Sequence, residues 1–199
     1  MAKILILIAV FFSTISSVYA QTAKEYYNRG LAHDKQGNLT QAIADYTKAI
    51  ETNPSVMSYY SWRGTAYEKQ GNFTQAISDY TKAIELDIKS KDNNWYYFTR
   101  QLFYTRRGDI YYEAGNLPQA ISDYTKAIEL APGDFLYLKR AKFYYEAKEY
   151  DKAWADVHQV ESSALAVKAK VDPKFLNDLK KASGRNQWFI VKPLFLGCL

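Results

Sequence analysis

The sequence predicts an all-α fold in which repeated pairs of helices stack side by side. The first observation is an eleven-residue segment, QAIADYTKAIE at 41–51, which returns as QAISDYTKAIE at 75–85 and 119–129. The copies begin 34 and then 44 residues apart, so a 34-residue unit repeats and ten extra residues precede the third copy. The second observation is that apolar or small residues recur in each copy with the period of one helix face. The third is a Gly-Asn pair ahead of each copy, which suits a turn between two helices.

The first twenty residues have the composition of a signal peptide. Lys3 supplies a positive charge, residues 4–12 are an unbroken apolar run, and Val18 and Ala20 are small enough for a cleavage site. Nine apolar residues are too few to cross a bilayer, which requires about 20. We therefore expect residues 1–20 to be removed after Ala20. The mature chain would then be exported, to a periplasm or outside the cell, without a transmembrane anchor.

Each eleven-residue segment is expected to be the second helix of a pair, and the first helix of each pair contains a glycine. Gly30, Gly64 and Gly108 lie at the same offset before their segments. A glycine inside a helix costs about 1 kcal/mol relative to alanine, so its return in every unit needs a compensating contact. We expect close packing against small residues of the second helix to provide it. These residues are Ala42, Ala76 and Ala120.

This pattern of aromatic, glycine and alanine residues over 34 positions resembles the tetratricopeptide repeat. Three units are expected at about 23–56, 57–90 and 101–133, and a weaker fourth at 134–166, where Lys148 replaces the turn glycine. The resemblance implies a right-handed superhelix of stacked antiparallel helix pairs, an α-solenoid, within residues 21–185. The residues that carry it are Tyr26, Gly30 and His33, then Tyr60, Gly64 and Tyr67, then Tyr104, Gly108 and Tyr111.

A capping helix and an apolar tail are expected after the repeats. Asp172 can cap a helix with Pro173 in its first turn, and the pattern predicts a capping helix over 172–184. Its apolar face would cover the last helix pair, which otherwise exposes its core. Residues 186–199 are apolar but too few to span a membrane. The tail could fold back on the array, occupy its groove or associate with a partner.

An arginine and an aspartate recur sixteen residues apart in all four units. The spacing puts the arginine on the first helix and the aspartate on the second, which favours internal ion pairs over four ligand-binding arginines. Because exposed ion pairs contribute only about 0–1 kcal/mol each, we expect these pairs to orient helices more than to stabilise them. The pairs are Arg29 with Asp45, Arg63 with Asp79, Arg107 with Asp123, and Arg140 with Asp156.

Charge and cysteine content narrow the classes of partner. The formal net charge is +5, but the basic residues are scattered instead of forming a stripe that follows nucleic-acid phosphates. Cys198 is the only cysteine in the sequence, so a disulfide is possible only with another chain. We expect no nucleic-acid partner, and association through Cys198 or the tail stays open.

No catalytic or metal-binding pattern is found in the sequence. His33 and His158 have no cysteine or second histidine at ligand spacing. A glycine-rich phosphate loop and a G-x-S-x-G elbow are also absent from the sequence. We predict a protein without enzymatic activity, metal or cofactor.

The resemblance implies that a partner binds in a concave groove lined by the first helices of the pairs. Trp62 and Arg106 are the leading candidates, because tryptophan and arginine often dominate interfaces, although Trp62 could also pack within the chain. Chaperone-binding members of the family hold a peptide carboxylate in this groove. Only Arg106 matches that residue set, so this role is not expected. The groove candidates are Lys24, Tyr27, Asn28, Leu31, Ser61, Trp62, Thr65, Thr105, Arg106, Asp109, Leu138, Lys139 and Lys142.

The ten-residue insertion brings aromatic residues that the repeat does not require. They are Trp95, Tyr96, Tyr97 and Phe98. These rings could cover a gap between the second and third units, or form a lip on the groove for an apolar peptide or a sugar. The sequence thus predicts an exported, non-catalytic adaptor or scaffold that holds a peptide or protein. The alternatives are a glycan- or envelope-polymer-binding protein that uses the insertion, and a structural subunit of an envelope complex.

Overall fold

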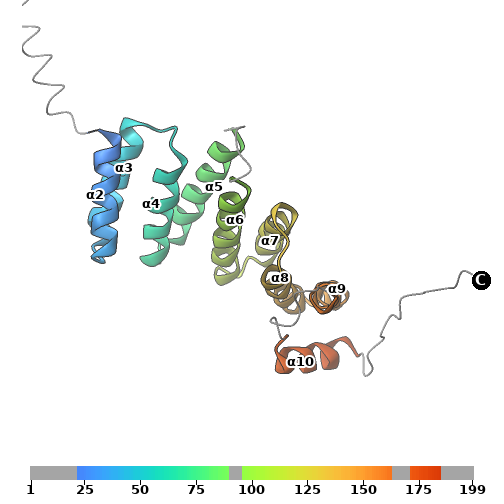
Figure 1. Cartoon of the computed structure of the whole chain (residues 1–199). Helices are drawn as coiled ribbons and strands as arrows, with labels where there is room; N and C mark the ends of the chain where they lie inside the picture. Colours follow the sequence, from blue (N-terminus) through green and yellow to red (C-terminus); the bar gives the residue numbers. More distant parts are fainter. Residues whose placement is uncertain (1–21, 90–95, 163–170, 185–199) are drawn as a thin grey trace, which may run out of the picture. The chain divides into compact units, whose positions relative to one another are not determined.

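In the computed structural model, which describes residues 22–89, 96–162 and 171–184, all regular secondary structure of those residues is α-helical (Figure 1). This confirms the predicted all-α fold class. The chain divides into two compact units, residues 1–110 and 111–199, and the boundary lies inside α6. The helices are α2 (Ala23–Lys35), α3 (Leu39–Thr52), α4 (Met57–Lys69), α5 (Phe73–Lys89), α6 (Tyr96–Glu113), α7 (Leu117–Leu130), α8 (Asp134–Glu146), α9 (Tyr150–Glu161) and α10 (Pro173–Ser183).

Consecutive helices within each unit pack as neighbours, and tight turns join the members of a pair. In the first unit α2 packs on α3 and α4 on α5, and in the second unit α8 packs on α9. The turn glycines Gly37, Gly71 and Gly115 have φ angles of +78°, +77° and +75°. This left-handed conformation is the one that glycine adopts without steric cost. Lys148 takes the same conformation in the fourth turn, with φ +61°, so the degenerate unit keeps the turn at some cost in strain.

The buried core of each pair comes from the apolar stripe of the second helix. Ala42, Tyr46 and Ala49 of α3 are completely buried, and the corresponding residues of α5 and α7 are at most 1% exposed. Gly64 packs close to the second helix as predicted, since a Cβ atom there would lie 3.5 Å from the backbone oxygen of Ala76, but the contact of Gly30 differs from the prediction. A Cβ atom on Gly30 would lie 2.6 Å from Cε1 of Tyr46, so the ring of Tyr46, and not Ala42, occupies the space beside this glycine.

The ten-residue insertion lengthens the two helices that flank it. α5 has 17 residues and α6 has 18, whereas α2 to α4 have 13 or 14. Asp87, near the end of α5, is 1% exposed and forms an ion pair with Arg100 of α6. A carboxylate at this depth requires a charged partner, so the pair ties the two lengthened helices together.

The repeated arginines also reach the preceding helix pair. Arg63 Nη1 donates to Thr47 Oγ1 at 3.1 Å, and the hydroxyl of Thr47 donates in turn to the carbonyl oxygen of Ile43 at 2.8 Å. In the second unit Arg140 Nη1 donates to Thr125 Oγ1 at 2.9 Å. Arg107 and Thr81 make the same contact at 2.7 Å. Each such threonine follows the repeated aspartate by two residues, so its hydroxyl links one pair to the next.

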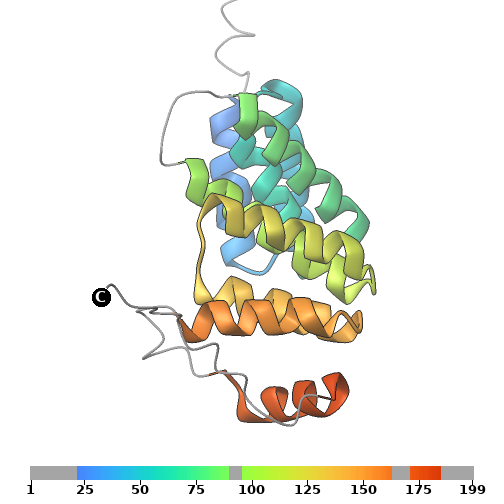
Figure 2. The same cartoon turned by 90° about the vertical axis from the view of Figure 1, so that its right-hand side faces the viewer.

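α10 covers the last helix pair, as predicted. Its N-terminus is capped by Asp172, whose side chain accepts a hydrogen bond from the backbone of Lys174 at 3.0 Å. Phe175 and Leu179 are buried in a cluster with α8 and α9 residues, and Figure 2 shows α10 beside that pair. The indole of Trp154 also donates to Ser183 Oγ at 3.1 Å. α10 therefore closes the apolar end of the array.

The hydrogen bond from Arg63 to Thr47 should stabilise the fold, and a matched control variant can isolate its contribution from that of losing any threonine hydroxyl. Thr47→Val keeps the side-chain shape but removes the acceptor for Arg63, and we expect the free energy of unfolding to fall by about 1–2 kcal/mol. The exposed hydroxyl of Thr52 donates only to the carbonyl of Lys48, so Thr52→Val should change stability by less than about 0.5 kcal/mol. Urea denaturation of the two variants measures both values. Equal losses would contradict a role for the link between pairs.

Candidate functional site

Trp62 lies on the first-helix surface of the first unit, where its ring is exposed. Its exposed fraction is 38%, the largest among the tryptophans that the structure describes. The hydroxyl of Tyr27 on α2 interacts with the side chains of Ser58 and Trp62. Burial raises the pKa of Tyr27, and the neighbouring donor groups of Ser58 and Trp62 oppose the rise.

Aromatic rings hold Tyr27 in place behind Trp62. The ring centroid of Tyr27 lies 5.1 Å from that of Tyr59 and 6.0 Å from that of buried Tyr46. Such spacings are typical of favourable aromatic pairs. Leu31, another groove candidate, packs with Tyr27 against the buried cluster of Ala42, Tyr46 and Ala66. Tyr27 and its aromatic neighbours therefore lie close to an indole that is 38% exposed.

Arg106, the other leading candidate, has an internal partner. Its Nη1 atom lies 3.3 Å from Glu68 Oε1, and Glu68 Oε2 accepts a hydrogen bond from the Tyr80 hydroxyl at 2.6 Å. The hydroxyl of Thr65 is 3.0 Å from the same Tyr80 oxygen. Burial and the neighbouring Glu68 carboxylate raise the pKa of Tyr80. This network joins α4, α5 and α6. Glu68 and Tyr80 lie at its centre, and the sequence analysis did not identify either of them as part of the site.

The groove candidates of the second unit lie together at a pocket of about 210 Å³ between α8 and the start of α10. We call it the α8–α10 pocket. Phe135 at its edge is 62% exposed, and Lys139 Nζ lies 5.8 Å from the Phe135 ring centroid. Sequence reasoning missed the contribution of the capping helix, because α10 has no counterpart in the repeats. The pocket is lined by Phe135, Leu138, Lys139, Lys142, Val171, Asp172 and Phe175.

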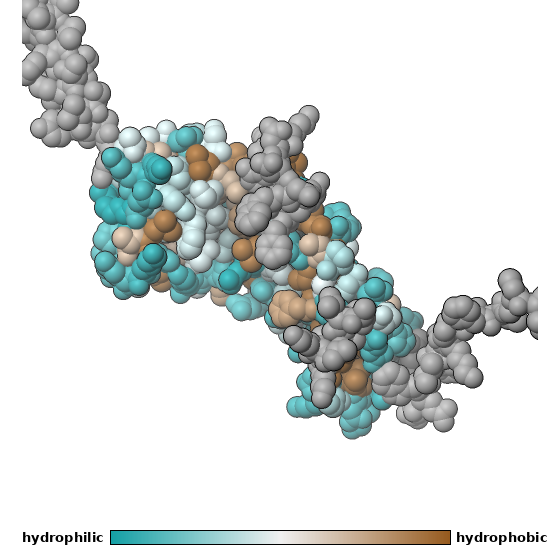
Figure 3. Space-filling model, in the orientation of Figure 1, coloured by the Kyte–Doolittle hydropathy of each residue, from teal (hydrophilic) through white to brown (hydrophobic). Residues whose placement is uncertain are grey.

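The other groove candidates do not join a single site. Lys24 and Asn28 are exposed on α2, while Ser61, Thr105 and Asp109 are half-buried. The hydroxyl of Thr105 donates to the carbonyl of Gln101 within α6. On the face shown in Figure 3, apolar residues form small patches among hydrophilic ones.

Several predicted features lie outside the described residues. These are the signal peptide at 1–20, the side chains of Trp95, Tyr96, Tyr97 and Phe98, and the tail at 186–199 with Cys198. Of the insertion aromatics, only the backbone from Tyr96 onward is described, as the beginning of α6.

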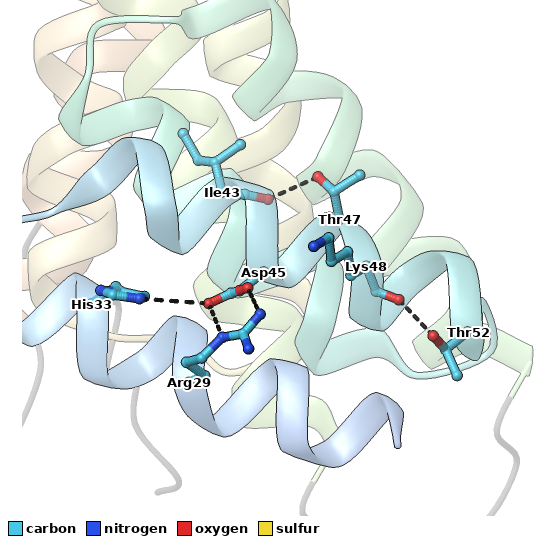
Figure 4. Close-up of polar contacts among 7 residues, drawn as sticks. All are labelled: Arg29, His33, Ile43, Asp45, Thr47, Lys48 and Thr52. Atoms are coloured by element: carbon cyan, nitrogen blue, oxygen red, sulfur yellow. Dashed lines mark hydrogen bonds and ion pairs between the residues drawn. The ribbon is translucent and has the colours of Figure 1, made fainter. Parts of the chain in front are cut away.

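Three of the four Arg–Asp pairs form two-point contacts between the helices of a pair. Arg63 Nε and Nη2 donate to the two Asp79 oxygens at 2.9 and 2.8 Å, and Arg140 donates likewise to Asp156 at 2.9 and 2.7 Å. Figure 4 shows the first pair: Arg29 Nε donates to Asp45 Oδ2 at 2.8 Å, and its Nη2 bonds the second oxygen.

The remaining pair, Arg107 with Asp123, stays a prediction because its members belong to different units. His33 Nε2 also lies 3.8 Å from Asp45 Oδ2. The hydrogen bonds from Arg29 hold the pKa of Asp45 below its ordinary value, although burial acts in the opposite direction. The carboxylate of Asp45 is only 5% exposed. Its charge is therefore stabilised by Arg29, with His33 nearby.

Metal-binding clusters and membrane-spanning helices are both absent from the residues that the structure describes. Those residues contain no group of three or more histidine, cysteine, aspartate or glutamate side chains placed to hold a metal ion. Within the same ranges, every helix is too short or too polar to cross a membrane.

Comparison with known proteins identifies the repeats. Residues 23–56, 58–89 and 102–134 match the family described as tetratricopeptide repeat. No curated protein sequence matches the chain significantly.

Solved structures with similar folds include three that illustrate the range of matches. The N-terminal domain of stress-induced protein-1 (STI-1) from C. elegans is 21% identical, with a TM-score of 0.57 over 61% of this chain and 93% of that one. The first TPR domain of Spaghetti (RPAP3), bound to the HSP90 peptide SRMEEVD, is 26% identical, with a TM-score of 0.54 over 64% and 94%. A crystal structure of MamA is 21% identical, with a TM-score of 0.64 over 81% and 82%.

The lowered pKa of Asp45 predicts how the stability contribution of this carboxylate depends on pH. A carboxyl group with a depressed pKa stabilises the fold above its ordinary pKa of about 3.9 and loses that contribution as pH falls through the folded-state value. We expect Asp45→Asn to cost about 1 kcal/mol at pH 7, because the partly exposed Arg29 weakens the pair. The difference from wild type should shrink steadily below pH 4. Denaturation curves at several pH values measure it.

The matched control for this experiment is Asp178→Asn on α10. We expect that variant to stay within about 0.5 kcal/mol of wild type at neutral pH. A cost of Asp45→Asn that did not diminish in acid would contradict a charge effect.

Proposed function

The chain belongs to the tetratricopeptide-repeat family, and on this premise we propose that it is a non-catalytic adaptor that binds a peptide or protein partner on the first helices of its pairs. The fold supports this proposal, because the first helices of its pairs carry exposed side chains, Trp62 and Phe135 among them. The RPAP3 domain, which is 26% identical, binds an HSP90 peptide in its solved structure.

The exposed ring of Trp62 is the observation that carries the proposal. A tryptophan that is 38% exposed leaves apolar surface in water, and tryptophan is among the residues that contribute most to binding energy. We infer that the partner places an apolar side chain, or another flat apolar group, against this indole.

A partner held mainly by a peptide carboxylate does not fit this surface. Arg106 is the only candidate that matches the carboxylate-binding residues of the family, and it is paired with Glu68. A carboxylate would have to compete with that internal partner. We therefore do not extend the HSP90 peptide of the RPAP3 structure to this chain.

We also propose that the protein is exported after cleavage at Ala20. The first described helix is capped by Thr22, just beyond the proposed cleavage point. Thr22 Oγ1 accepts from Glu25 N at 3.2 Å, and the Glu25 carboxylate accepts from Thr22 N at 2.8 Å. This capping box belongs wholly to the proposed mature chain, so removal of the leader would leave the start of α2 intact.

Peptides selected on the full mature protein from a phage-displayed library test the role of Trp62. We expect Trp62→Ala to weaken the selected peptides at least tenfold, which corresponds to about 1.4 kcal/mol. Trp62→Phe should retain most of the affinity, because the ring and not the N–H makes the contact. Isothermal titration calorimetry measures the affinities.

Ile88→Ala is the control for exposed apolar area, because Ile88 is 53% exposed on α5. We expect that variant to bind within about twofold of wild type. A failure to select any peptide above background, or equal losses for Trp62→Ala and Ile88→Ala, would rule out the proposed site.

Export is tested by the mass and N-terminal sequence of the protein recovered outside the cytoplasm of an exporting host. We expect a chain that begins at Gln21. Ala20→Arg should block cleavage, because the site requires a small residue there, and should leave the chain twenty residues longer. Tyr19→Phe, at a position that the peptidase does not read, is the matched control. Recovery of the wild-type protein in the cytoplasm with its first twenty residues intact would refute export.

A further inference from the structure

The α8–α10 pocket combines an apolar floor with an exposed aromatic edge. Phe135 is 62% exposed, whereas Phe175 from α10, which also lines the pocket, is buried. Lys139, Lys142 and Asp172 supply its charged groups. Exposed apolar surface beside a hollow of this kind is typical of a binding site for an apolar side chain.

We propose that this pocket binds the C-terminal tail of the same chain, through the aromatic residues at 188–190. The tail begins directly after α10, at the end of the helix opposite to the pocket. Val171 and Phe175 line the pocket at the start of α10, and the helix ends at Gly184. Gly184 has a φ angle of +69°, the left-handed conformation that turns a chain away from the helix axis.

The length of the tail fits a return to the pocket. From Phe175 to Gly184 the helix rises about 14 Å, at about 1.5 Å per residue. An extended chain covers about 3.3 Å per residue, so about four to six residues beyond Gly184 bring it back beside Phe175 and Val171. The residues at that distance are Trp188, Phe189 and Ile190.

The apolar character of residues 188–191 and the tethering of the tail to α10 both favour the tail as the occupant of the pocket. Residues 188–191 are uncharged and apolar, so the two lysines of the pocket do not repel them. Lys192 follows directly in the sequence, so a tail docked through residues 188–190 would bring its positive charge toward Asp172, which lines the pocket. Because a short connection gives a tethered segment an effective concentration of the order of millimolar, the chain's own tail outcompetes a second copy at ordinary concentrations.

A docked tail would lie against Leu138, Lys139 and Lys142, which are also groove candidates. A partner that binds at these residues would therefore compete with the tail. This consequence rests on the proposed function, whereas the docking itself does not.

Disulfide trapping in the full chain tests the docking. Cys198→Ser removes the native cysteine, and Ile190→Cys is then combined with Lys139→Cys at the pocket. The matched control combines Ile190→Cys with Lys152→Cys. Lys152 has a side chain that is 62% exposed, and it lies near Ser183, at the end of α10 where the tail begins. An undocked tail would therefore reach Lys152→Cys more readily than Lys139→Cys.

Under mild oxidation we expect the Lys139→Cys variant to form an intramolecular disulfide at least ten times faster than the Lys152→Cys variant. Mass spectrometry detects the loss of two hydrogens in the monomer. Adding Phe135→Asp should reduce the Lys139→Cys rate to that of the control. Because Phe135 is 62% exposed, we expect this variant to stay folded, which circular dichroism checks.

Three outcomes would overturn the proposal. They are equal or faster trapping at Lys152→Cys, a rate that Phe135→Asp leaves unchanged, and disulfide-linked dimers that predominate and increase with protein concentration. None of these measurements requires a partner. Their result is therefore independent of the Trp62 titration that tests the proposed function.

Discussion

The arrangement of helices in each unit depends on arginine side chains that are bound at two places at once. Arg63 and Arg140 each hold a carboxylate that is only 4% exposed, and each also donates to a threonine of the preceding pair. Loss of the arginine would leave the carboxylate buried without its charge partner, which is far more costly than loss of an exposed ion pair. The planar guanidinium also fixes directions as well as distances. One side chain thus sets both the approach of two helices within a pair and the position of the next pair.

This constraint determines which surfaces are available for binding. The arginine lies on the first helix of a pair, so the other sides of the same helix are held at a defined orientation. On α4 an adjoining side presents Trp62, close to Tyr27 of α2. In the second unit the equivalent surface of α8 meets the capping helix and becomes a pocket. The two units therefore offer different contacts: an exposed flat ring in one, and a hollow with an aromatic edge in the other.

Much of the fold could be predicted because the same local sequence pattern occurs in three successive units. Helix period, turn glycines and the cap at Asp172 are local properties, and the structure contains each of them. Contacts between elements were harder to predict. The sequence suggested Ala42 as the neighbour of Gly30, but a long ring from one turn further, Tyr46, reaches the glycine instead. The partner of Arg106 and the walls of the α8–α10 pocket depend on residues outside the repeating pattern, so no spacing in the sequence could reveal them.

The end of the array differs chemically from its interior. The fourth unit has an exposed His158 at the position where Thr47, Thr81 and Thr125 accept an arginine N–H. A bulky imidazole replaces the compact hydroxyl there, so the fourth unit lacks the threonine acceptor of the other three. Gene duplication could therefore lengthen the protein by inserting a unit at an internal junction, where both groups are present. A unit appended after α9 would lack this threonine acceptor, so an internal junction offers an added unit one contact that the end of the array does not.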